Sequence, residues 1–152
     1  MSSARALLLG RNRDRSRLDP RLLAPPACFA LVFAAYAAGV FEVAGGVVFL
    51  AGDAAVVGSL AAAALAVRRN GLVASWTVVY AALLGYSADH YLLGLSGRSL
   101  GDRLVALLGV DGLVYLGVQA LVIGTLAWLA GRLVGLAGTA LGRRYGVSRR
   151  DG

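Results

Sequence analysis

Residues 112–131, GLVYLGVQALVIGTLAWLAG, form a run of twenty residues without a charged side chain. A helix of about 20 apolar residues is long enough to cross the roughly 30 Å hydrocarbon core of a bilayer. Gln119 lies near the centre of this run, one helical turn after Tyr115, and an amide in hydrocarbon requires a hydrogen-bond partner on another helix. The run therefore predicts a transmembrane helix in which Tyr115 and Gln119 contribute to helix packing.

The composition of the whole chain supports a membrane protein. Of its 152 residues, 59% are hydrophobic and 15% are charged, and the mean hydropathy is +0.73. Soluble domains are about 45–50% apolar, because a folded chain must cover a large surface with polar groups. The composition therefore excludes a soluble enzyme domain, a disordered tail and a disulfide scaffold. The single Cys28 is interpreted as an apolar filler.

Three further apolar runs precede residues 112–131, and each is long enough to form a membrane span. The four predicted spans cover approximately residues 22–44, 47–67, 72–95 and 112–131. Gly45-Gly46 lies between the first two spans, and Asn70-Gly71 follows the second; both dipeptides are typical of turns. The sequence therefore predicts an all-α, polytopic membrane protein with four transmembrane helices in two hairpins, within a transmembrane domain of residues 22–142.

The boundary between the first two spans is left open by the sequence. Asp53 falls about two turns inside the second predicted span, where a carboxylate is costly. Alternatively, residues 42–53 form a connection along the membrane interface, and a shorter helix begins at Ala54.

A short helix is predicted between the third and fourth spans. Ser99 followed by Asp102 before an apolar run is typical of a helix N-cap with an acidic first turn. Gly109 and Gly112 interrupt the pattern before the last span. We therefore expect an interfacial helix near residues 100–109.

The charges are sorted along the chain. All 15 basic residues are arginines, and the net charge is +7. Thirteen of these arginines lie in residues 1–21, 68–71 and 132–152, whereas five of the eight acids lie in the connections on the other side. Cytoplasmic segments of membrane proteins carry an excess of basic residues. The pattern predicts a cell-membrane protein with both termini in the cytoplasm.

The two ends of the chain are predicted to be basic cytoplasmic tails, residues 1–21 and 143–152. The apolar run 6–9 is too short to span a membrane or to anchor a helix, so we expect the first tail to be mobile and to touch the anionic lipid surface.

Four ionisable residues near the outer ends of the spans form a candidate polar or ion site: Glu42, Asp53, Asp89 and His90. Ionisable groups near membrane depth are functional candidates because burying them is costly. Such a cluster could bind a cation or relay protons, whereas carboxylates at helix ends are more often simply solvated. No metal site is predicted, because the one histidine has no further ligands at a recognised spacing.

Aromatic residues form a stripe on the third predicted span. The stripe comprises Trp76, Tyr80, Ser87 and Tyr91. Tyr86 and His90 form an i,i+4 pair beside it. We interpret the stripe as a seam between helices together with an interfacial aromatic belt. The alternative is an aromatic-lined pocket for a hydrophobic ligand such as a quinone or a lipid.

Gly131 and Gly135 match the small-xxx-small pattern that allows helix backbones to approach closely. They are further candidates for helix packing, although chance matches are expected in a chain with 21 glycines.

The leading functional hypothesis is a non-enzymatic accessory or structural membrane component without a cofactor. It would pack in the lipid bilayer against other membrane subunits or copies of itself. No phosphate-binding loop, dinucleotide-binding fingerprint or nucleophile elbow is present. The alternative is a small oligomer that translocates ions or protons, or binds a hydrophobic ligand. A nucleic-acid partner is not expected, because the arginines lie in tails and short loops rather than on a folded polar face.

Overall fold

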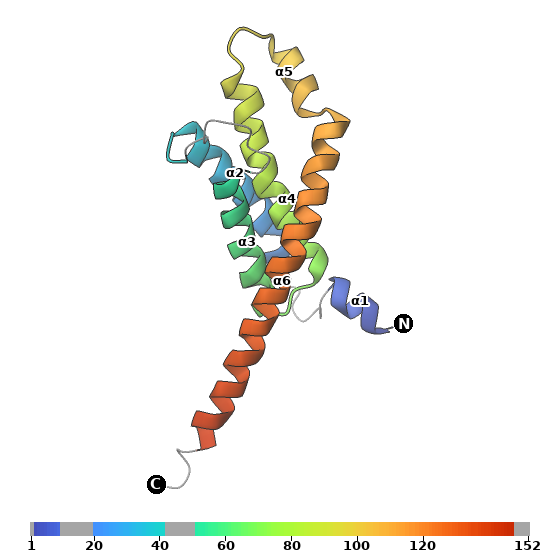
Figure 1. The fold of residues 1–152 in the computed structure, drawn as a ribbon, viewed down its shortest axis with the longest axis vertical. Helices are drawn as coiled ribbons and strands as arrows, with labels where there is room; N and C mark the ends of the chain where they lie inside the picture. The colour runs from blue at the N-terminus through green and yellow to red at the C-terminus, as the bar shows by residue number, and fades with distance from the viewer. Residues whose placement is uncertain (1, 10–19, 42–50, 148–152) are drawn as a thin grey trace.

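The computed structural model describes residues 2–9, 20–41 and 51–147, and every regular element in these ranges is helical (Figure 1). The elements are α1 (Ser2–Leu9), α2 (Pro20–Ala37), α3 (Gly52–Val67), α4 (Leu72–Asp89), the π-helix η1 (His90–Gly94), α5 (Leu100–Leu107) and α6 (Val110–Val147). The all-α prediction is therefore confirmed for this part of the chain.

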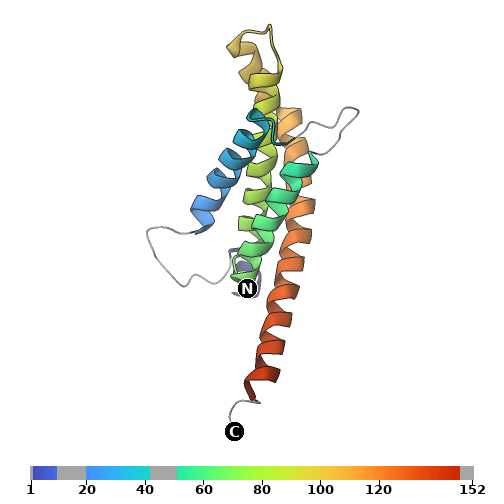
Figure 2. The same cartoon turned by 90° about the vertical axis from the view of Figure 1, so that its left-hand side faces the viewer.

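The helices α2, α3, α4 and α6 lie side by side and alternate in direction (Figures 1 and 2). Helix α4 is central, since it packs against α2, α3 and α6, and α3 also packs against α6. We call one end of the bundle the turn end, because it holds the connection between α3 and α4 at residues 68–71. The opposite end holds η1, α5 and the start of α6, and we call it the α5 end.

Helix α2 ends well before the predicted boundary at residue 44. Gly39 has a positive φ of 69°, and the N–H of Val40 donates to the carbonyl of Ala35 over 2.9 Å. A glycine in the left-handed conformation commonly ends a helix in this way, because it has no Cβ to clash. The predicted first span is therefore wrong at its C-terminal end. The Gly45-Gly46 dipeptide lies outside the described residues.

Helix α3 begins at Gly52 rather than at residue 47, so the longer of the two sequence interpretations is wrong here. Asp53 lies in the first turn of α3 and is exposed, which is a favourable place for a carboxylate because the helix N-terminus carries partial positive charge. The alternative with a helix from about Ala54 comes within two residues of the structure.

The helices after α3 lie close to the positions predicted from the sequence. Helix α4 and η1 run without a break from Leu72 to Gly94, close to the predicted 72–95. The predicted short helix is α5, and its cap is formed as expected: the Ser99 Oγ accepts from the Asp102 N–H over 3.2 Å and donates to Asp102 Oδ2 over 2.7 Å. Helix α6 contains 38 residues, and it continues past residue 131 beyond the turn end (Figure 1).

The first tail differs from its prediction. Ser2–Leu9 form α1, which packs against α4, and Arg21 Nη1 donates to the Leu9 carbonyl over 2.8 Å. The expectation that this tail holds no helix is therefore wrong for these eight residues. The apolar side chains Leu7–Leu9 are exposed.

Helix α6 is the one helix in the described ranges that is long and apolar enough to cross a membrane, over Val110–Ala140. Helices α2 and α3 are also apolar but shorter, over Arg21–Ala37 and Gly52–Val67. The described part of the chain thus contains one helix that qualifies as a candidate span, where the sequence predicts four.

Two glycines allow α2 and α3 to approach α4 closely. A Cβ added at Gly85 on α4 would lie 2.8 Å from the Phe29 carbonyl oxygen on α2. A Cβ added at Gly58 on α3 would lie 3.1 Å from the Val79 Cα on α4. At Gly85 there is no room for a side chain, and at Gly58 an added Cβ would require the neighbouring helix to shift, so at both crossings the helix backbones lie close together.

Two further glycines do the same for α6. A Cβ added at Gly124 would lie 2.9 Å from the Trp76 Cδ1 on α4. At Gly131 an added Cβ would overlap the Ala63 carbonyl oxygen on α3 and would lie 2.9 Å from the Ala66 Cβ. Gly131, a candidate for helix packing from its sequence pattern, therefore lies within the chain's own α3–α6 contact.

Replacing Gly131 by alanine is expected to lower the free energy of unfolding by about 1–3 kcal/mol, because α3 and α6 must separate to admit the methyl group. Gly138→Ala on the same helix is the matched control, since no atom lies within 4 Å of its added Cβ. There the better helix propensity of alanine should leave stability unchanged or raise it by up to about 1 kcal/mol. Thermal unfolding of both variants in detergent tests this, and equal melting temperatures would contradict the close contact.

Candidate functional site

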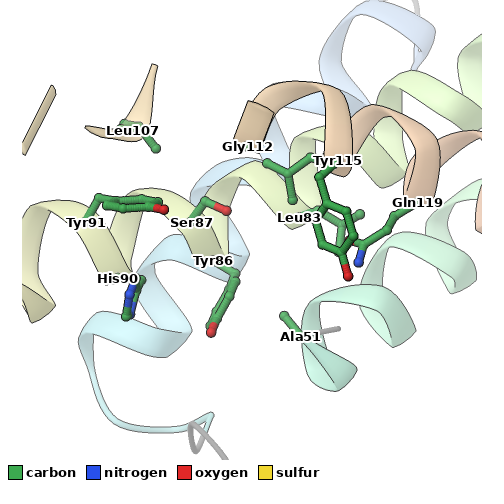
Figure 3. A pocket seen from close by; sticks show the side chains of 11 residues that line it. Ala51, Leu83, Tyr86, Ser87, His90, Tyr91, Leu107, Gly112, Tyr115 and Gln119 are labelled. Carbon is green, nitrogen blue, oxygen red and sulfur yellow. The ribbon is translucent and has the colours of Figure 1, made fainter. Parts of the chain in front are cut away.

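A cavity of about 160 Å³ lies toward the α5 end of the bundle, and we call it the aromatic cavity (Figure 3). Helices α4, η1 and α6 form most of its wall, while α5 and the residue before α3 complete it. It is lined by Ala51, Leu83, Tyr86, Ser87, His90, Tyr91, Leu107, Gly112, Tyr115, Leu116 and Gln119.

Helical spacing explains why these residues meet. Leu83, Tyr86 and Ser87 on α4 are followed at the same spacing by His90 and Tyr91 on η1. Positions separated by three or four residues share a helix face. On α6, the lining residues from Gly112 to Gln119 repeat the same spacing. An aromatic face of α4 and η1 and a face of α6 that carries Tyr115 therefore line the same cavity.

The π-helix η1 lies at the edge of the cavity. Its wider turn begins at His90, and π-helical segments change the direction of the side chains that follow them. Arg103 of α5 donates to the Leu92 carbonyl over 2.7 Å and to the Arg98 carbonyl over 3.1 Å. These bonds satisfy a carbonyl near the end of η1 and hold α5 against it.

A series of ring contacts connects α2 with the cavity. Tyr36 on α2 lies 5.0 Å from Tyr86, measured between ring centroids, and 5.2 Å from Phe41. His90 lies 6.3 Å from Tyr86 and 5.3 Å from Tyr91. Such separations are typical of favourable aromatic pairs, so the rings hold one wall of the cavity in place.

Tyr115 and Gln119 supply polar groups from α6. Their side chains point in the same direction, toward Ala51 (Figure 3). Both take part in further interactions within the chain. Sequence reasoning assigned this pair to helix packing, whereas the structure places both residues in the lining of the cavity as well.

The four residues of the candidate polar or ion site have different surroundings. Asp53 is exposed and Asp89 is half-buried, and both lie within electrostatic reach of the Tyr36 hydroxyl. His90 is exposed at the cavity edge, and Glu42 lies outside the described residues. Within the described ranges, no group of three or more His, Cys, Asp or Glu residues could hold a metal ion.

The aromatic stripe of α4 divides between two roles. Trp76 belongs to the seam with α6, because its Nε1 donates to Thr125 Oγ1 over 3.0 Å. Ser87 and Tyr91 line the cavity instead. One part of the stripe therefore lies in a seam between helices and another part lines a cavity, while the interfacial belt and the bound ligand stay predictions. The sequence showed the Tyr115–Gln119 pair on the last predicted span, but helical spacing alone did not indicate that this pair and the stripe on α4 line the same cavity.

Gly135 is less tightly packed than Gly131. A Cβ added there would lie 3.8 Å from the Cα of Val67, which is an ordinary van der Waals distance.

Thr125→Val should lower the free energy of unfolding by about 1–3 kcal/mol, because it removes the acceptor for the half-buried Trp76 indole N–H. Thr139→Val is a matched control on the same helix, since the Thr139 hydroxyl donates only within its own turn, to the Leu136 carbonyl over 2.8 Å. Thermal unfolding in detergent measures both effects. If both substitutions had the same effect, Trp76 would not depend on this bond.

Comparison of the chain with known protein families, with curated proteins and with solved structures finds no match. The function must therefore be inferred from the distribution of side chains over the bundle and from the chemistry of its cavities.

Proposed function

We propose that the chain is a multi-pass integral membrane protein that acts by packing and binding rather than by catalysis. In this proposal α2, α3, α4 with η1, and α6 each cross the membrane once. The observation that carries it is the distribution of side-chain size: small residues fill the inside of the bundle, and large aliphatic residues cover its outside.

More than half of the buried apolar residues in the described part are alanines: Ala51, Ala54, Ala55, Ala62, Ala66, Ala82, Ala88, Ala120 and Ala127. In contrast, Leu60, Leu126 and Leu133 are 68%, 63% and 66% exposed. Many other large apolar side chains in the described part are exposed as well, and extensive exposed apolar surface is rare on soluble monomers. Small residues between helices and large apolar residues outside them are typical of membrane bundles.

The charges of the described residues support one orientation. The turn end holds Arg21, Arg68, Arg69 and Arg132, and Arg21 Nε donates to Asn70 Oδ1 over 2.8 Å. The acids Asp53, Asp89, Asp102 and Asp111 lie toward the α5 end, together with Arg98 and Arg103. By the positive-inside rule, the turn end faces the cytoplasm, and so do the start of α2 and the end of α6.

The lengths of the helices are compatible with four crossings. At 1.5 Å per residue, the 18 residues of α2 and the 16 residues of α3 reach about 27 and 24 Å. A hydrophobic stretch shorter than the hydrocarbon core is accommodated by local thinning of the bilayer, at a modest cost per ångström. The longer α6 projects into the cytoplasm beyond the turn end.

Cysteine labelling in whole cells tests the topology. In a Cys28→Ala background, a membrane-impermeant maleimide should label Ser96→Cys in intact cells and Arg68→Cys only after permeabilisation. Both positions are exposed, so accessibility within the fold does not limit the reaction. Labelling of both positions from the same side would overturn the four-span proposal.

The aromatic cavity favours a second function, the binding of a hydrophobic ligand with a polar head group. Its volume of about 160 Å³ is close to that of the roughly 150 Å³ engineered cavity that holds benzene. Phenol groups from Tyr86, Tyr91 and Tyr115 and the amide of Gln119 offer hydrogen bonds at its wall. One oxygen-bearing ring, such as the head group of a quinone, fits these dimensions and this chemistry.

Filling the cavity tests this second function. Gly112 lines the cavity, and no atom lies within 4 Å of its added Cβ, so Gly112→Leu should place a side chain in the cavity without disturbing the fold. We expect about tenfold weaker binding of a short-tailed benzoquinone, which corresponds to about 1.4 kcal/mol, by calorimetry in detergent. Gly117→Leu is the control, because Gly117 has equal space but does not line the cavity. Equal affinities of the two variants would exclude the cavity as the binding site.

A further inference from the structure

A second, larger cleft of about 430 Å³ lies at the turn end, between the end of α3 and α6. Its charged groups are the guanidinium groups of Arg69 and Arg132, and the Thr139 hydroxyl is a further polar group in the lining. Val67 of α3 forms part of the apolar wall. No carboxylate occurs in this lining, so the cleft has a positive potential that nothing in its wall neutralises.

Arg132 is held in position by a buried tryptophan. Its guanidinium lies over the ring of Trp128, 5.3 Å from the centroid. Trp128 is itself fixed, because its Nε1 donates to the Asn70 carbonyl over 3.2 Å. A cation over an aromatic face is attracted by the ring and still presents its N–H groups at its edges. Arg132 can therefore contact the ring and an anion at once.

Arg69 is held in position by its backbone. It is the one non-glycine residue with a positive φ in the described part of the chain, at 62°. Its N–H donates to the Ala66 carbonyl over 3.0 Å, and the N–H of Asn70 donates to the Leu65 carbonyl over 3.0 Å. These bonds end α3. They place Arg69 on the α6 side of the turn, whereas Arg68 does not line the cleft.

The cleft is continuous with the apolar outside of the bundle. Val67 also belongs to an outward stripe of α3 at helical spacing with Val56 and Leu60, and all three are exposed, at 45%, 58% and 68%. This stripe leads from the cleft toward the α5 end, which is the direction of the bilayer centre in the proposed topology. A ligand with a negative head group and a hydrocarbon chain matches both surfaces.

We propose that this cleft binds an anionic glycerophospholipid of the cytoplasmic leaflet. Arg69 and Arg132 bind the phosphate, since guanidinium groups match phosphate oxygens in charge and geometry. The acyl chain lies along the stripe of Val67 and Leu60. Basic pockets between helices on the cytoplasmic side are the usual recognition sites for such head groups. The choice of leaflet rests on the proposed four-span topology.

Titration of the purified protein with phosphatidylglycerol in an uncharged detergent tests the site, with native mass spectrometry as the readout. We expect tighter binding of phosphatidylglycerol than of zwitterionic phosphatidylcholine. Arg69→Gln and Arg132→Gln should each weaken phosphatidylglycerol binding about fivefold. Arg68→Gln is the matched control, because it removes the same charge one residue away from the cleft, and it should leave binding unchanged.

Three results would overturn the proposal: equal binding of the two lipids, equal loss in Arg68→Gln, or undiminished binding in the Arg69 and Arg132 variants. Displacement of the lipid by millimolar inorganic phosphate would show a free-phosphate site instead. Arg69→Gly separates binding from folding, because glycine accepts a positive φ at no cost. It should keep or raise the melting temperature and still lose lipid binding.

The outcome of the lipid-binding experiment does not depend on the outcome of the labelling experiment. Lipid binding in detergent involves no membrane sides, so the arginine dependence can be measured whatever the topology. If labelling placed both ends of the bundle on one side while the arginine dependence remained, the four-span proposal would fail and the lipid site would stand.

Discussion

Direct contact between helix backbones is the constraint on which the rest of this bundle depends. Gly58, Gly85, Gly124 and Gly131 each occupy a crossing where an added Cβ would lie within about 3 Å of the neighbouring helix. The contacts are close because the core between the helices consists mainly of alanine. With so little side-chain volume inside, many large aliphatic residues face outward, which is typical of helix bundles in an apolar surrounding.

The two ends of the bundle differ in the larger residues that lie beyond the close glycine contacts. Toward the α5 end, α4 and α6 separate (Figure 1), and tyrosines surround the aromatic cavity between them. At the turn end, Asn70 accepts hydrogen bonds from Arg21 and Trp128 and so connects α2, the turn and α6. Within the described residues, no buried side-chain polar atom lacks a hydrogen-bond partner. This matters in an apolar medium, where unpaired polar groups are costly.

Local signals in the sequence predicted several elements well. Ser99 and Asp102 form the expected cap of α5, because a cap depends only on residues within one turn. The turn at residues 68–71 also occurs as predicted, although the left-handed residue is Arg69 rather than Asn70 or Gly71. The end of α2 was misplaced because a single glycine, Gly39, ends the helix inside an apolar run. Hydropathy does not register such a backbone conformation.

The sequence by itself determined that the chain is helical and apolar, where its later helices lie, and how its charges are distributed between alternate connections. These properties follow from composition and from spacing over a few residues. Only the tertiary structure decided that Tyr115 and Gln119 line one cavity with Tyr86 and His90, and that Arg69 and Arg132 share a cleft. The residues of each site belong to different elements of the chain, and helical periodicity does not specify which helix faces meet. Here the choice is made by the few glycines at which two backbones can touch.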